Sequence, residues 1–132
     1  MISLKPTRSA LTLVAILAAA FLLVGCGGAP ATGWSSARVV DQTAYLGTTA
    51  GKIMAVNTAD GTVLWQYPKD GTLKSIYGTP AIVDNVLYVG AFDHKMYALN
   101  AATGEKKWEF DAGAPVVSSP TVGGGIVYFG SN

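Results

Sequence analysis

Few residues of this chain could take part in chemistry. The 132 residues include one cysteine, Cys26, and one histidine, His94, beside eight acidic and nine basic side chains. A single cysteine excludes an intrachain disulfide and leaves thiol catalysis and zinc–thiolate sites out of the candidates. His94 follows Asp93 at an expected hairpin tip and has no second His or Cys beside it. A turn residue that tolerates left-handed backbone geometry is therefore favoured over a general base or a metal ligand.

The acidic side chains fall mostly in or beside expected turns, where Asp commonly caps its own backbone. Gly123–Gly125 lacks the Lys-Ser/Thr and the helix of a phosphate-binding loop, so we predict a turn there. No Ser/His/Asp set can be assembled around a single histidine. The sequence thus predicts no catalytic, cofactor-binding or metal-binding residue. The acidic residues given this turn role are Asp41, Asp60, Asp84, Asp93, Asp111, Glu105 and Glu109.

The N-terminal segment has the pattern of an export signal, predicted over residues 1–25. Lys5 and Arg8 precede an apolar run of about 15 residues, short of the roughly 20 that span a bilayer as a helix. Leu23-Val24-Gly25-Cys26 resembles the lipobox of bacterial lipoproteins. That resemblance implies cleavage before Cys26 and lipidation of its thiol, with two or more acyl chains needed for stable anchoring. An uncleaved membrane anchor and a secretory signal with unmodified Cys26 are the alternatives.

The segment after the signal is predicted to be near neutral. Removing Lys5 and Arg8 from the nine basic residues leaves seven against eight acidic ones, a formal charge of −1. This balance argues against a nucleic-acid partner, which would favour a basic stripe. Membrane attachment would then depend on the lipid. Residues 26–35 are expected to form a flexible tether, because Gly27–Gly33 is small, uncharged and rich in Gly and Pro.

The rest of the chain is predicted to be all-β and repetitive. No long window keeps a helical period, and short β-type runs alternate with turn pairs such as Asp84-Asn85. The glycines Gly47, Gly90 and Gly130 lie 43 and 40 residues apart, a period typical of propeller blades. Each ends a stretch with a Tyr two residues before the Gly: Ala37–Gly47, Pro80–Gly90 and Pro120–Gly130.

A second pattern follows each of the first two stretches, over Ala55–Trp65 and Ala98–Trp108. A strand ends at Asn, a turn needs Gly with a positive φ, and the next strand carries Trp. This pattern resembles the tryptophan-docking motif of the quinoprotein-like (PQQ-repeat) β-propellers, with Asp60 where Thr is usual. The resemblance implies that Trp65 and Trp108 wedge between blades, each burying about 150–250 Å². The structural residues of the repeat are then Gly47, Gly61, Trp65, Gly90, Gly104, Trp108 and Gly130.

The resemblance covers residues 36–132 and implies a partial propeller of about two blades plus partial ones. Repeats are expected near 37–79 and 80–119, with a truncated third from 120. In the family, an N-terminal strand commonly finishes the last blade, so Ser35–Val40 is expected to complete a blade formed by C-terminal strands. The chain is therefore interpreted as the N-terminal part of a longer protein, with ring closure by self-association as the alternative.

Two functions follow from the resemblance. The first is a non-catalytic, lipid-anchored propeller, extracytoplasmic and facing the periplasm or the cell surface, that binds other envelope proteins. The similarity points to the BamB-like lipoproteins of outer-membrane protein assembly. The second is the N-terminal part of a dehydrogenase that holds pyrroloquinoline quinone and calcium at a site beyond Asn132. The absence of a Cys-Cys pair and of any catalytic residue favours the first, and no cofactor is expected in this chain.

Overall fold

The computed structural model describes residues 35–132, and all regular structure in this range is β-strand. The all-β prediction is confirmed for these residues. The predicted signal over residues 1–25, Cys26 and almost all of the predicted tether lie outside the described range. Within that range no helix has the length and hydropathy to cross a membrane.

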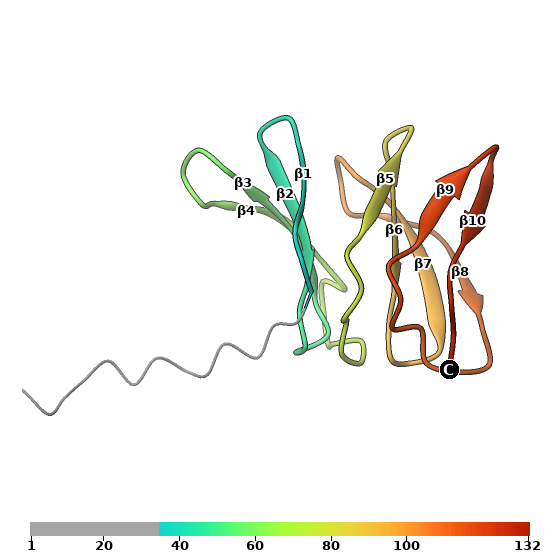
Figure 1. Cartoon of the computed structure of the whole chain (residues 1–132). Coiled ribbons are helices and arrows are strands. Elements are labelled where there is room, and N and C mark those ends of the chain that lie inside the picture. The colour runs from blue at the N-terminus through green and yellow to red at the C-terminus, as the bar shows by residue number, and fades with distance from the viewer. Residues whose placement is uncertain (1–34) are drawn as a thin grey trace, which may run out of the picture. The chain divides into compact units, whose positions relative to one another are not determined.

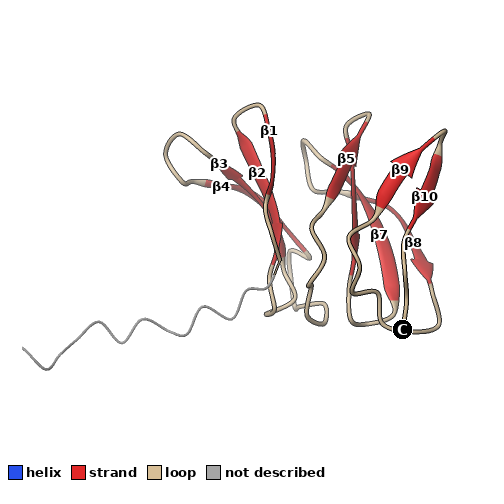
Figure 2. Ribbon diagram, viewed as in Figure 1, coloured by secondary structure: helices blue, strands red, loops and turns tan. Residues whose placement is uncertain are grey.

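The first sheet contains four antiparallel strands in the order of the sequence. They are β1 (Arg38–Val40), β2 (Thr43–Gly47), β3 (Ile53–Asn57) and β4 (Val63–Tyr67). Each strand pairs with the one before it, so the sheet is a meander of hairpins (Figures 1 and 2).

The second sheet repeats this arrangement, and a third sheet begins it again. The second sheet has the order β5-β6-β7-β8, and the third contains only β9 and β10. The opening hairpin of each sheet has the same register, in which the Tyr of the repeat faces the first strand: Arg38↔Tyr45, Ala81↔Tyr88 and Thr121↔Tyr128. The strands are β5 (Ala81–Val83), β6 (Val86–Gly90), β7 (Lys95–Asn100), β8 (Lys106–Asp111), β9 (Thr121–Gly123) and β10 (Ile126–Tyr128).

One expectation about this topology is wrong. The stretch Ser35–Val40 does not complete a blade made of C-terminal strands, because β1 pairs with β2 and opens the first sheet. The physical reason is the tight turn at Asp41, whose φ of 52° folds the chain directly back on itself. β1 is therefore equivalent to β5 and β9, the first strands of their sheets.

The predicted turns lie where the chain reverses. Asp84, Asn85 and His94 all have positive φ values, between 49° and 75°, as expected for polar residues in left-handed turn positions. Gly124 and Gly125 also have positive φ and form the turn between β9 and β10. The turn predictions for His94 and for Gly124 and Gly125 are confirmed, whereas Gly123 is the last residue of β9.

Gly47 and Gly90, which end β2 and β6, leave room for the loop that connects each sheet to the next. A Cβ on Gly47 would collide with the side chain of Ile76, and one on Gly90 with Val116. Ile76 and Val116 are completely buried, and each lies in the loop that leads to the next sheet. Each loop therefore packs directly against the preceding sheet, and this close approach requires glycine at positions 47 and 90.

Candidate functional site

Trp65 on β4 joins the first sheet to the second. Its Nε1–H donates a hydrogen bond to the carbonyl oxygen of Ala101, 2.9 Å away, in the turn between β7 and β8. Gly104 in the same turn lies against the indole, where an added Cβ would be 2.5 Å from Cε3 of Trp65. Tyr45 also packs against the indole, with ring centroids 6.0 Å apart. Trp65 therefore has the wedge position that the sequence predicts for it.

Trp108 occupies the equivalent position on β8 but is 41% exposed. It repeats the contact within the sheet, because its ring lies 5.9 Å from that of Tyr88. The positions equivalent to Ala101 and Gly104 would fall beyond residue 132, so the described residues do not place Trp108 between two complete sheets. A Cβ added to Gly61, the counterpart of Gly104, would meet no heavy atom within 4 Å.

An apolar groove runs between β8 and β10. Phe110 and Phe129 meet edge to face across it, with centroids 6.3 Å apart. Phe110 and Ile126 are more than half exposed, so the groove is open to solvent. Its lining consists mainly of Trp108, Phe110, Ile126, Val127 and Phe129.

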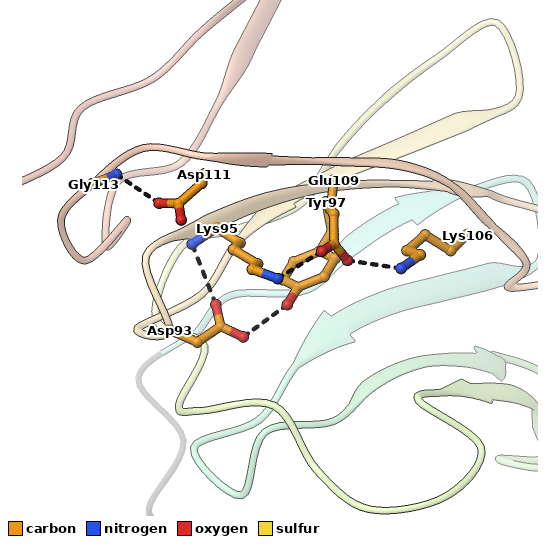
Figure 3. Close-up of polar contacts among 7 residues, drawn as sticks. All are labelled: Asp93, Lys95, Tyr97, Lys106, Glu109, Asp111 and Gly113. Carbon is orange, nitrogen blue, oxygen red and sulfur yellow. Dashed lines mark hydrogen bonds and ion pairs between the residues drawn. The ribbon is translucent and has the colours of Figure 1, made fainter.

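Charged side chains gather on β7 and β8, as Figure 3 shows. The Glu109 carboxylate accepts hydrogen bonds from Nζ of Lys106, at 2.7 Å, and from Nζ of Lys95, at 2.6 Å. These two ammonium groups, Lys106 first, lower the pKa of Glu109 to about 2. Glu109 in turn raises the pKa of both lysines. The three side chains thus form two ion pairs that share the Glu109 carboxylate at the surface.

Tyr97 extends this group into the molecule. Its ring is buried, and its hydroxyl donates a 2.8 Å hydrogen bond to Oδ2 of Asp93. Burial, followed by the effect of the Asp93 carboxylate, raises the pKa of Tyr97 well above its usual range. The phenol is therefore held neutral as a structural donor.

Three of the acidic residues, Asp60, Asp93 and Asp111, cap their own backbone as predicted for turns. Oδ1 of Asp60 accepts from the backbone N–H of Thr62, and Oδ1 of Asp111 accepts from that of Gly113. Asp93 does the same for Lys95. The turn role expected for Glu109 is wrong, because Glu109 lies within β8 and pairs with two lysines. Within residues 35–132 no three His, Cys, Asp or Glu side chains lie together in a way that could hold a metal ion.

Two exposed aromatic side chains meet at the loop end of the first two sheets, a feature that the sequence analysis missed. Tyr77, in the β4–β5 loop, and Phe92, in the β6–β7 turn, are 37% and 42% exposed. Their rings pack edge to face with centroids 6.0 Å apart, and the N–H of Phe92 donates to the Ser75 carbonyl. The repeat contains a sequence signal for this pair, because an aromatic residue occurs at each of the two positions in only one of the repeats 37–79 and 80–119. The equivalent of Phe92 in the first copy is Thr49, and the equivalent of Tyr77 in the next copy is Val117.

Comparison with a family model identifies the repeat. The model described as "Outer membrane protein assembly factor BamB" matches residues 25–92 and 69–132, which overlap and together extend from residue 25 to the end of the sequence. None of the curated proteins compared with the chain matches it.

Solved structures share the fold. Quinohemoprotein alcohol dehydrogenase from Comamonas testosteroni is 26% identical with a TM-score of 0.65, over 74% of this chain and 17% of that one. BamB from Moraxella catarrhalis is 22% identical with a TM-score of 0.61, over 72% of this chain and 29% of that one. The computationally designed Ika8 protein is 18% identical with a TM-score of 0.59 and the same coverage. The chain spans less than a third of each of these structures. The predicted partial propeller of PQQ-like repeats is confirmed.

Proposed function

The chain belongs to the family described as outer membrane protein assembly factor BamB, and from this membership we propose a non-catalytic, lipid-anchored scaffold for protein binding. The observation that carries the proposal is the extent of the family match, which runs from residue 25 to residue 132. The matched region begins beside the lipobox cysteine. In this proposal the protein takes part in outer-membrane protein assembly.

The anchor in this proposal is the lipid on Cys26. The lipobox Leu23–Cys26 and the preceding charged and apolar segments support it. With a formal charge of −1 after the signal, the chain has little electrostatic attraction to anionic headgroups, so acyl chains would supply the attachment. The propeller would then face the periplasm or the cell surface.

The binding surface in this proposal is the aromatic pair Tyr77–Phe92. Aromatic side chains are enriched in protein interfaces because they bury a large area and lose little conformational entropy. Tyr77 follows Ile76, which is buried against the first sheet, so the pair is presented by a rigid support. The pair also departs from the repeat, as expected of a site that serves a partner and not the stacking of the sheets.

A double variant tests this surface. Tyr77→Ala with Phe92→Ala should leave the circular dichroism unchanged and reduce in-cell cross-linking to the outer-membrane protein assembly machinery at least tenfold. Leu64→Ala is the matched control, since Leu64 is at least as exposed but lies on β4, away from the loop pair. Undiminished cross-linking of the double variant, or an equal loss in the control, would reject the surface.

A second candidate is part of a pyrroloquinoline quinone dehydrogenase, favoured by the likeness to quinohemoprotein alcohol dehydrogenase. The described residues do not fit that cofactor, because no cluster of carboxylates lies together among them to take calcium. The one cysteine also cannot form a vicinal disulfide. In this candidate, residues outside 35–132 would supply at least part of the cofactor and calcium site. Natively purified protein that releases the quinone in a one-to-one ratio would establish this candidate in place of the scaffold.

A further inference from the structure

A second groove follows the first strands of the three sheets. We name as the inner groove the space lined by Arg38 of β1, residues 79–83 and residues 119–122, which include β5 and most of β9. Within the described range, β1, β5 and β9 each pair only with the strand that follows them (Figure 1). The inner groove has a volume of about 300 Å³, at the lower end of the range for ligand sites. Neither residue of the aromatic pair Tyr77–Phe92 lines it.

The inner groove has the shape of an extended chain. Two of its walls are runs of consecutive residues, 79–83 and 119–122. Because extended backbone rises about 3.3 Å per residue, these walls continue for roughly 13–16 Å. An extended segment of four or five residues has the same length, whereas a compact ligand would contact only part of either wall.

Arg38 gives the inner groove its charge. It is the only ionisable side chain among the lining residues. Among residues 35–132 the ion pairs are those of Glu109 with two lysines, so none engages Arg38. Arg38 also departs from the repeat, since its equivalents are Ala81 and Thr121. A guanidinium recognises a carboxylate by two parallel hydrogen bonds, and the groove therefore favours a ligand that carries one.

Hydroxyl groups line the same groove. Oγ of Ser119 accepts a 2.8 Å hydrogen bond from the backbone N–H of Thr79, which fixes the oxygen and does not use the hydroxyl proton. Thr121 on β9 is exposed and adds a second hydroxyl. Both groups can donate to carboxylate or carbonyl oxygens of a chain that lies along the groove.

We propose that the inner groove binds an extended, acidic segment of a partner protein. A carboxylate of that segment pairs with Arg38, and the hydroxyls of Ser119 and Thr121 donate to its other oxygen atoms. An amide in place of the carboxylate would leave the guanidinium without a counter-charge, so the site discriminates between the two. This site is separate from the Tyr77–Phe92 surface and does not depend on the scaffold proposal.

The test compares two capped five-residue peptides, Thr-Glu-Val-Glu-Thr and the same peptide with glutamine in place of both glutamates. Their binding to the full, natively processed protein is measured by titration calorimetry at low ionic strength. The acidic peptide should bind about fivefold more tightly or better. Arg38→Gln should abolish this preference, and Arg38→Lys should retain part of it. Lys107→Gln removes an exposed charge from β8 and should behave like the wild type.

The variants separate this site from a general attraction of charge. Arg38 is exposed, so Arg38→Gln should fold with an unchanged circular dichroism spectrum. Thr121→Val removes one hydroxyl at nearly constant volume and should weaken binding of the acidic peptide severalfold. Equal affinity of the wild type for the two peptides overturns the proposal, as does a preference that survives in Arg38→Gln. An equal loss of preference in Lys107→Gln, or unchanged affinity in Thr121→Val, also overturns it, because the peptide would then bind elsewhere.

Discussion

The indole Nε1–H of Trp65 donates to the carbonyl oxygen of Ala101 and so links β4 of the first sheet to the β7–β8 turn of the second. Residues 36 positions apart are thereby joined by one polar contact between the two sheets. The same turn supplies Gly104, whose missing side chain admits the ring. One copy of the docking motif therefore binds to the next copy, which explains why tryptophan and glycine recur together.

Trp65→Ala should destabilise the protein by about 3 kcal/mol, the lower end of the range for deleting a buried large aromatic, since Trp65 is only partly buried. Trp108→Ala in the same chain should cost clearly less, because that ring is 41% exposed. Urea unfolding followed by circular dichroism measures both. Equal losses would contradict the different packing of the two rings.

Gly104→Ala and Gly61→Ala form a matched pair. Both positions have φ near +75°, so each alanine carries the strain of a left-handed backbone, about 1–2 kcal/mol. At Gly104 the new methyl also meets the indole of Trp65, whereas at Gly61 it meets nothing within 4 Å. Gly104→Ala should therefore be more destabilising by roughly 1–3 kcal/mol, as in overpacking. Thermal or urea unfolding of the two variants measures the difference, and similar stabilities would show that the turn does not receive the ring.

The Glu109 carboxylate should make stability depend on acid. Because its folded pKa is about 2, below the ordinary 4.5, its contribution is present above pH 4.5. That contribution is lost as the pH falls from 4.5 to about 2. Glu109→Gln should be slightly less stable than the wild type at neutral pH and equal to it once the pH is below the folded pKa. Parallel urea midpoints at all pH values would show that the two lysines do not hold the carboxylate.

Cys26→Ser should release the protein from membranes, because serine cannot be lipidated through a thioether. The measurement is the distribution between membrane and soluble fractions of cells that express the wild type or the variant. Cys26→Ser that stays in the membrane fraction after a carbonate wash would contradict lipid anchoring.

Much of the fold could be predicted because its signals are local. The turns at Asp84 and His94 depend only on the backbone conformation of these residues themselves, so residue type alone predicts them. The regular spacing of Gly47, Gly90 and Gly130 can also be read directly from the sequence. The place of β1 was not predicted correctly. A strand of three residues matches the first strand of any sheet equally well, and only its hairpin with β2 determines where it pairs.

The candidate site was less predictable because it depends on register and on departures from the repeat. Glu109 faces Lys95 only through the pairing of β7 with β8, which shifts at a bulge between Ala98 and Leu99. The contact of Tyr77 with Phe92 joins a loop to a turn of the next sheet, and no local pattern encodes it. The exposure of Trp108 likewise depends on what packs against β8.

The most direct test of the scaffold proposal is the amount of folded β-barrel protein in the outer membrane of the native host after deletion of the gene. We expect a clear decrease that is restored by the wild-type gene but not by Cys26→Ser or by the Tyr77→Ala, Phe92→Ala double variant. An unchanged outer-membrane protein content in the deletion strain would contradict a role in outer-membrane protein assembly.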